Sequence, residues 1–214
     1  MIGASAPPFE LQRWLQGEPI DPAGDSGKVI LAEVFQVNCP GCFVHALPEV
    51  LELHRRYADQ GLAVIGIATA FEDFEHNTEA NLEMLLEHGR LQGAPLQQLG
   101  KAGLLDGDRL DYRLEFPVAM DAMIETAPDT SPETVRAFIL EQLPDFDRMS
   151  EDDRAIVTQR ARDYLASRTR LPVTFSRYRL QGTPSSILID RDGLLHDVGF
   201  GWTHHLEPLI QKLL

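Results

Sequence analysis

Two apolar runs, residues 29–35 and 62–68, predict buried strands on either side of a helix. Only Glu33 interrupts the first run, as is typical of a central strand covered on both faces. Between the runs, residues 43–59 carry apolar side chains at helical spacing and stop before Gly61, and Pro48 predicts a kink. A strand, a helix and a strand in this order predict a βαβ unit with parallel strands and a right-handed crossover.

The two ends of the chain also give strand patterns. Residues 9–15 alternate between apolar and polar side chains before a turn at residues 16–19, which predicts a short N-terminal β-hairpin. A second hairpin is predicted from residues 185–189 and 194–200, because Asp190 to Gly193 form a strong turn signal. We expect a terminal helix over residues 203–214.

The middle of the chain is predominantly helical. Asn77 or Thr78 caps a predicted helix that ends near Gly89, a looser stretch covers residues 92–113, and residues 116–121 form a short strand. Pro117 indicates an edge strand or a first strand position. Helices starting at Ser131 and Ser150 predict a helical insertion over residues 124–170. The expected fold class is α/β, with residues 1–214 forming a single domain around a central mixed sheet flanked by helices.

The charge excludes several function classes. The 214 residues contain 33 acidic and 19 basic side chains, a net charge of -14, and 21 of the acids lie within residues 71–170. Such a chain repels phosphate backbones and anionic lipids, so we expect neither nucleic-acid nor membrane partners. No apolar run reaches transmembrane length, and the first residues have no basic or hydrophobic leader pattern. A cytoplasmic location is therefore expected.

The two cysteines stand together as Cys39-Pro40-Gly41-Cys42, between a buried strand and a helix. This placement is a signature of thiol redox chemistry. The helix N-terminus stabilises a thiolate and lowers its pKa, which makes Cys39 the nucleophile. Cys42 lies one turn further on and is suited to resolve a mixed disulfide. Half a zinc site and an inert cysteine pair are the alternatives; no second Cys-x-x-Cys supports zinc, and no histidine stands at an obvious ligand spacing.

Two further side chains near the cysteines can carry protons. Glu33 lies on an apolar strand, where an acid is costly unless it is neutral or partnered, and a raised pKa suits proton exchange with Cys42. Alternatively, Glu33 points to a polar edge or pairs with Lys28 or an arginine. His45 follows Cys42 by about one turn and is a possible proton shuttle, although an exposed helix histidine fits the pattern equally well.

Seven motifs occur in a recognisable order: Gly27-Lys28, the cysteine motif, Leu47-Pro48, Val64-Ile65-Gly66-Ile67, Phe116-Pro117-Val118, Gly182-Thr183-Pro184 and Ile189-Asp190-Arg191-Asp192-Gly193. Over about 130 residues this order resembles the TlpA/ResA-like thiol-disulfide oxidoreductases of the thioredoxin superfamily, which have a redoxin (AhpC/TSA-like) domain.

The resemblance implies a thioredoxin-like fold, redox cycling of Cys39 and Cys42, and a cis peptide between Thr183 and Pro184 that faces them. It also implies that the backbone of Thr183 binds the substrate chain, beside Pro40 and Gly41. The chain departs from these relatives in three ways. Asn38 replaces a tryptophan that many of them carry, the helical insertion lies outside their pattern, and most of them are exported or anchored.

We therefore expect a thiol-disulfide oxidoreductase that acts on protein dithiol or disulfide substrates, uses an unknown electron donor, and needs no metal or organic cofactor. Its direction of exchange is left open, and the helical insertion offers a surface for oligomerisation. One alternative is a peroxiredoxin-type thiol peroxidase, although Gln36 replaces the signature threonine. The others are a module binding copper or another metal through the cysteines with His45 or His196, and a scaffold whose acidic insertion binds a basic partner.

Overall fold

The computed structural model describes residues 2–20, 27–202 and 206–214. Its contacts divide the chain into a larger unit, Met1–Met123 with Pro172–Leu214, and a smaller unit, Ile124–Leu171. Each unit is described by itself below. The expectation that residues 1–214 form a single domain with an insertion over residues 124–170 stays a prediction.

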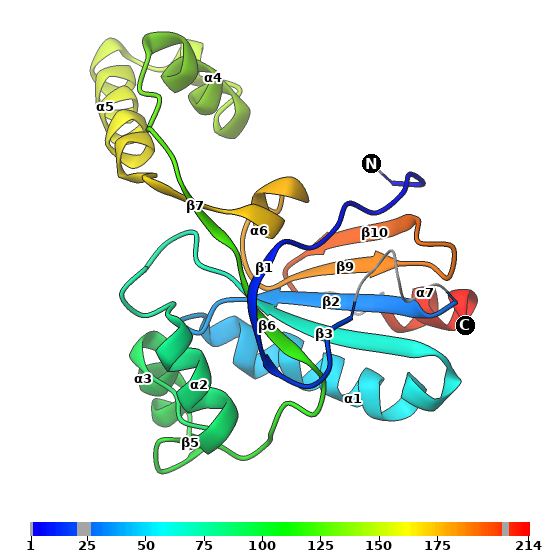
Figure 1. Ribbon diagram of the computed structural model, residues 1–214. Helices are drawn as coiled ribbons and strands as arrows, with labels where there is room; N and C mark the ends of the chain where they lie inside the picture. Colours follow the sequence, from blue (N-terminus) through cyan, green and yellow to red (C-terminus); the bar gives the residue numbers. More distant parts are fainter. Residues whose placement is uncertain (1, 21–26, 203–205) are drawn as a thin grey trace. The chain divides into compact units, whose positions relative to one another are not determined.

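The larger unit is built on a six-stranded mixed sheet with the strand order β1-β6-β3-β2-β9-β10 (Figure 1). Strand β2 is parallel to β3, and β3 is parallel to β6, whereas the other three pairings are antiparallel. This arrangement confirms the predicted thioredoxin-like α/β fold, its βαβ unit and its C-terminal hairpin. The strands are β1 (Leu11–Gln16), β2 (Val29–Phe35), β3 (Leu62–Ala68), β6 (Val118–Asp121), β9 (Ser185–Ile189) and β10 (Leu195–Phe200).

The predicted N-terminal β-hairpin is wrong for the described residues. Strand β1 pairs antiparallel with β6, with Trp14 opposite Ala119, and not with the segment that follows it. Part of that segment, residues 21–26, lies outside the described residues. Because β1 lies at the edge of the sheet, β6 is an inner strand and not the edge strand that Pro117 indicated. Pro117 lies immediately before the first residue of β6. A proline there removes no N–H group from the strand itself.

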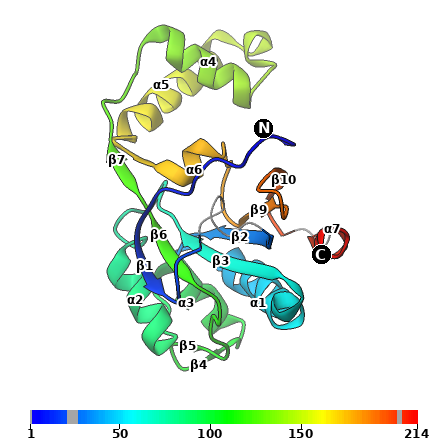
Figure 2. The same ribbon diagram turned by 45° about the vertical axis from the view of Figure 1, so that its right-hand side comes forward.

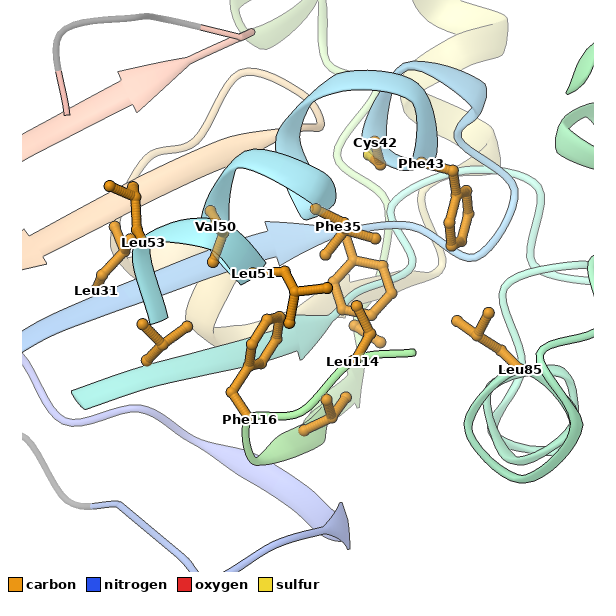
Figure 3. Close-up of a cluster of buried hydrophobic side chains, with 14 of the residues drawn as sticks. Leu31, Phe35, Cys42, Phe43, Val50, Leu51, Leu53, Leu85, Leu114 and Phe116 are labelled. Carbon is orange, nitrogen blue, oxygen red and sulfur yellow. The ribbon is translucent and has the colours of Figure 1, made fainter. Parts of the chain in front are cut away.

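Both faces of the sheet are covered, and the side chains of β2 contribute to the core on each face. The seven residues of β2 are all buried, as predicted. Leu31 and Phe35 belong to the core on the side of helix α1 (Leu47–Tyr57), beside Val50 and Leu51 (Figure 3). Ile30, like Ala32 and Val34, belongs to the core of the other face. Because side chains alternate along a strand, Glu33 falls on the α1 side, with Leu31 and Phe35.

The helix after the cysteines changes its hydrogen-bonding pattern along its length. A π-helical turn, Cys42–Ala46, precedes α1. Pro48 stands in the first turn of α1, where a missing N–H group is tolerated. Pro48 thus follows a π-helical turn within one continuous helical run, and the predicted kink stays a prediction. In the π-helical turn, the Phe43 carbonyl accepts a hydrogen bond from the Tyr112 hydroxyl at 2.8 Å.

The stretch of chain that connects β3 to β6 forms further helices and a short hairpin beside the sheet (Figure 2). Thr78 caps helix α2 (Glu79–His88) with its side chain, and Gly89 ends it, as predicted. The looser stretch expected after Gln92 instead forms α3 (Gly93–Lys101) and a short hairpin of β4 (Leu105–Asp106) and β5 (Arg109–Leu110). The glycines of this stretch hid the helical pattern from sequence reasoning.

Two further short helices belong to the larger unit. Helix α6 (Val173–Arg177), which sequence reasoning missed, follows the smaller unit, and α7 (Leu206–Leu213) ends the chain. The predicted start of the terminal helix falls on residues 203–205, which lie outside the described residues. Among the described helices, none combines the length and apolarity needed to span a bilayer.

The smaller unit contains the two helices predicted from the serine caps. Ser131 caps α4 (Pro132–Gln142) and Ser150 caps α5 (Glu151–Ser167), each through its side chain. The unit has a core of its own, formed by Val135, Ile139, Phe146 and Ala161. Strands β7 (Met123–Glu125) and β8 (Arg170–Pro172) pair where the chain enters and leaves this unit.

Candidate active site

Cys39 and Cys42 form a disulfide at the start of the helix that follows β2. Their Cα atoms lie 5.4 Å apart, and the Cys42 N–H group points at Cys39 Sγ with a nitrogen-sulfur distance of 3.3 Å. Cys42 is completely buried, whereas Cys39 is partly exposed. A thiolate at Cys39 would receive this N–H group and the positive end of the helix dipole. Cys39 is therefore the more accessible of the two sulfurs.

Thr183 and Pro184 lie directly beside Cys39. Their peptide bond is cis, and the Thr183 carbonyl oxygen lies 3.6 Å from Cys39 Sγ. Strand β9 begins immediately afterwards, and the Gly201 N–H group donates to the Pro184 carbonyl at 2.8 Å. The end of β10 thus holds this loop against the disulfide.

Pro40 and Gly41 form the first helical positions between the cysteines, and both are partly exposed. A side chain added at Gly41 would meet nothing within 4 Å. This side of the motif is therefore open to an approaching chain.

Glu33 is buried beneath the cysteine-bearing helix, with only 2% of its surface exposed. Burial raises the pKa of its carboxyl group well above the usual range, and the charge of Glu49 on α1 adds to the shift. Among residues 2–20, 27–202 and 206–214, its Oε1 atom has no hydrogen-bond partner and Glu33 forms no ion pair. For the described residues, the alternatives of a polar edge and of a pair with Lys28 or an arginine are therefore wrong.

His45 is exposed on the π-helical turn, and its ring stacks on the indole of Trp202. The ring centroids are 4.9 Å apart and the planes meet at 22°. The stack joins the helix to the residues that follow β10. His45 is thus the exposed helix histidine of the second alternative, and its role as a proton shuttle stays a prediction.

The alternatives to redox chemistry gain no support from the geometry. Within residues 2–20, 27–202 and 206–214, no three side chains of histidine, cysteine, aspartate or glutamate are grouped as metal ligands would be. His196 belongs to β10. Gln36 accepts a hydrogen bond through Oε1 from the Thr183 hydroxyl at 3.2 Å, so this residue faces the loop that carries the cis peptide.

Sequence reasoning missed the polar residues that surround the nucleophile. In the sequence, Gln36 marks only the absence of the peroxiredoxin threonine, and Asn38 marks only a departure from the resemblance. In the structure, the Asn38 backbone N–H group donates to Asn77 Oδ1 at 2.8 Å, and the Asn38 side-chain amide donates to Asp73 at 2.9 Å. Asn77, considered for a helix cap, instead contacts the cysteine loop.

Comparisons with known proteins give a partial match in sequence. No family model matches the chain. Protein FixW of Rhizobium leguminosarum is 26% identical over 129 residues, which cover 58% of this chain and 56% of that protein. The match therefore spans about half the length of this curated relative.

Two solved structures extend the likeness over almost the whole chain. A thiol-disulfide isomerase from Corynebacterium glutamicum has 25% identity and a TM-score of 0.60, covering 99% of this chain and 96% of its own. A thioredoxin-like superfamily protein has 23% identity and the same TM-score of 0.60, covering 98% of this chain and 96% of its own, and supports the fold.

The mixed sheet, the disulfide at a helix N-terminus and the cis proline facing it occur together in one chain with these likenesses. These features and likenesses show a thioredoxin-like fold that carries its disulfide and its cis proline at one site.

Proposed function

We propose that this protein exchanges disulfides with protein substrates through Cys39 and Cys42, in the manner of TlpA/ResA-like enzymes. The observation that carries the proposal is the unequal exposure of the two sulfurs beside the Thr183 carbonyl. Cys39 is partly exposed and lies next to Thr183, whereas Cys42 is buried behind it. One sulfur can meet a substrate and the other can only meet Cys39.

The exchange begins from the reduced dithiol. The Cys39 thiolate attacks one sulfur of a substrate disulfide, so a mixed disulfide forms and the other substrate sulfur leaves as a thiolate. Cys42 then loses its proton and attacks Cys39 Sγ, which releases the second substrate thiolate and forms the Cys39–Cys42 disulfide. Two electrons pass from the protein to its substrate, and the reverse sequence oxidises a substrate dithiol.

The residues around the disulfide bind the substrate chain and exchange a proton with Cys42. The backbone of Thr183 and Pro184 binds the substrate chain on one side of Cys39, and Pro40 and Gly41 leave the other side open. Glu33 exchanges the proton of Cys42, because its raised pKa brings its ionisation closer to the range in which thiols ionise.

This chemistry indicates the classes of partner. Protein thiols are the substrates, and a separate dithiol donor restores the reduced form. Oligomerisation through the helical insertion and the cytoplasmic location stay predictions from the sequence.

The test is exchange with a protein disulfide such as that of insulin. We expect Cys39→Ser to abolish exchange, because it removes the nucleophile. Cys42→Ser is expected to accumulate the mixed disulfide, detected by mass under non-reducing conditions, because nothing resolves it. Exchange by Cys39→Ser at the wild-type rate would contradict the mechanism, and so would a Cys42→Ser variant that never forms a mixed disulfide.

A further inference from the structure

A chain of hydrogen bonds joins the two loops that meet at Cys39. The Thr183 hydroxyl donates to Gln36 Oε1 at 3.2 Å, and the side-chain amide of Gln36 donates to the Glu72 carbonyl at 3.2 Å. The side-chain amide of Asn77 donates to the same carbonyl at 2.9 Å. The backbone of Glu72 is thus the point where the two branches of this chain meet.

The second branch ends at the residue before the nucleophile. Asn77 Oδ1 accepts the backbone N–H group of Asn38 at 2.8 Å. The Asn38 side chain is held at both ends, because it donates to Asp73 at 2.9 Å and accepts from the Ala94 N–H group at 2.8 Å. We call the side chains of Gln36, Asn38 and Asn77, with the Glu72 carbonyl, the amide relay.

Burial and hydrogen bonding restrict the movement of the amide relay. Gln36 and Asn77 are 3% and 4% exposed. Buried amides that satisfy both donor and acceptor are costly to disrupt, because a change of conformation leaves a polar group without a partner. The relay therefore fixes Thr183 and Asn38 relative to one backbone carbonyl.

We propose that Gln36 and Asn77 are positioning residues, and that the amide relay sets the placement of the Thr183 carbonyl against Cys39. Gln36 acts through Thr183 and governs binding of the substrate chain. Asn77 acts through Asn38 and keeps Cys39 at the helix N-terminus, where its thiolate is stabilised. The proposal rests on the proposed exchange function and assigns two residues that the cysteine motif does not include.

The two branches predict different defects. Gln36→Ala frees the Thr183 loop, so we expect KM for the protein disulfide to rise about threefold to tenfold, the range of one lost hydrogen bond, with kcat little changed. Asn77→Ala removes the acceptor of the Asn38 N–H group, so the position of Cys39 is less restrained. The Cys39 thiolate of the reduced form is then less stabilised. The equilibrium with glutathione should then shift about threefold to tenfold towards the Cys39–Cys42 disulfide.

The matched control is Asn81→Ala. Asn81 is an amide in the same segment that donates to the His76 carbonyl at 2.8 Å and lies outside the relay. We expect it to leave KM and the glutathione equilibrium within twofold of wild type. An Asn77→Ala equilibrium within twofold of wild type would overturn the proposal, as would an equal shift in Asn81→Ala.

A second pair of variants tests Asn38 without removing any relay side chain. A Cβ atom added at Gly93 would lie 2.2 Å from Asn38 Oδ1, whereas one added at Gly103 would meet nothing within 4 Å. Both glycines have positive φ, 59° and 69°, so both alanine variants carry backbone strain. Only Gly93→Ala is expected to shift the glutathione equilibrium; equal behaviour of the two variants would count against the relay.

The two proposals fail in different ways. If the wild-type protein exchanges no protein disulfide, the proposed function is wrong. KM for a protein disulfide can then not be measured. The glutathione equilibrium needs no protein substrate, so it still reads the effect of Asn77 on Cys39 in that case.

Discussion

Glu33 and Ser186 stand opposite each other on the neighbouring strands β2 and β9. Both are buried, and neither Glu33 Oε1 nor Ser186 Oγ has a hydrogen-bond partner among the residues that the structure describes. Paired residues of an antiparallel ladder point to the same face, so Ser186 lies with Glu33 on the α1 side of the sheet. A carboxylate in such surroundings is penalised by desolvation, and the neutral acid is favoured.

The first prediction concerns stability against pH. The pKa of Glu33 is raised in the folded protein, so its proton is held more tightly there than in the unfolded chain. The resulting stability is fully present below the unfolded pKa of about 4.5 and is lost as pH rises through the folded pKa. Glu33→Gln removes this loss. We expect the unfolding free energy of the variant, relative to that of wild type, to be higher at pH 8 than at pH 4.

Denaturant unfolding of both oxidised proteins at the two pH values measures this difference. Burial also raises the pKa of Asp121, but that residue is present in both proteins and cancels in the comparison. A difference in unfolding free energy that stays constant from pH 4 to pH 8 would show that Glu33 does not titrate as we infer.

The second prediction concerns the release of substrate. If Glu33 takes the proton of Cys42, Glu33→Gln slows the attack of Cys42 on the mixed disulfide by about tenfold or more. Rapid acid quenching after mixing reduced protein with a disulfide substrate, followed by mass analysis, measures the lifetime of the mixed disulfide. Glu49→Gln is the control: it keeps Glu33 and removes a charge that raises its pKa, so release should persist with its pH midpoint moved down. Release at the wild-type rate in Glu33→Gln would exclude this role.

The sequence predicted the inner strands because burial on both faces leaves a strong apolar pattern. Residues 29–35 and 62–68 were found with their bounds unchanged. The pairing of β1 with β6 was missed, because an edge strand can pair with any distant strand and local turn signals favour a hairpin. Helix α3 was missed because Gly93, Pro95 and Gly100 weaken a helical pattern.

The sequence likewise predicted some residues of the candidate site and missed others. The cysteines and Glu33 are conspicuous in a sequence, since each breaks the pattern around it. Gln36 and Asn77 are ordinary amides in loops, and their contacts join residues up to 147 positions apart. Only the folded chain brings Thr183, Gln36 and Asn38 to the same place, so no local pattern marks them.

The third prediction concerns Asp121, which holds the start of α6. Its carboxylate accepts hydrogen bonds from the backbone N–H groups of Thr174 at 2.8 Å and Phe175 at 3.1 Å, and from the Thr69 hydroxyl at 3.0 Å. Asp121→Ala leaves these buried donors without a partner. We expect a loss of about 3 kcal/mol in unfolding free energy, measured by denaturant titration.

Asp129 provides the matched control for this loss. It also accepts hydrogen bonds from a backbone N–H group and a hydroxyl, those of Ser131 and Thr134, but it lies exposed in the smaller unit. Water replaces these contacts after Asp129→Ala, so the loss should be clearly smaller than for Asp121→Ala. Equal losses would mean that burial does not set the cost.

The fourth prediction concerns the smaller unit, Ile124–Leu171. The Val173 N–H group donates to the Ala122 carbonyl at 2.8 Å, so the chain enters and leaves this unit at neighbouring points of the larger one. A short glycine-serine linker can therefore replace residues 124–171 without stretching the sheet. The smaller unit has its own core, and the cysteine site lies wholly in the larger unit. We expect the shortened protein to form the Cys39–Cys42 disulfide and to react with a small disulfide within about twofold of wild type.

Protein substrates and sedimentation then reveal what the smaller unit contributes. If it serves oligomerisation, the full-length protein sediments as an oligomer and the shortened protein as a monomer, with exchange retained. If it binds substrates, KM for protein disulfides rises while reaction with the small disulfide is unchanged. A shortened protein that folds, as judged by circular dichroism, but fails to form the disulfide would contradict the prediction, because the larger unit would then be unable to support the chemistry alone.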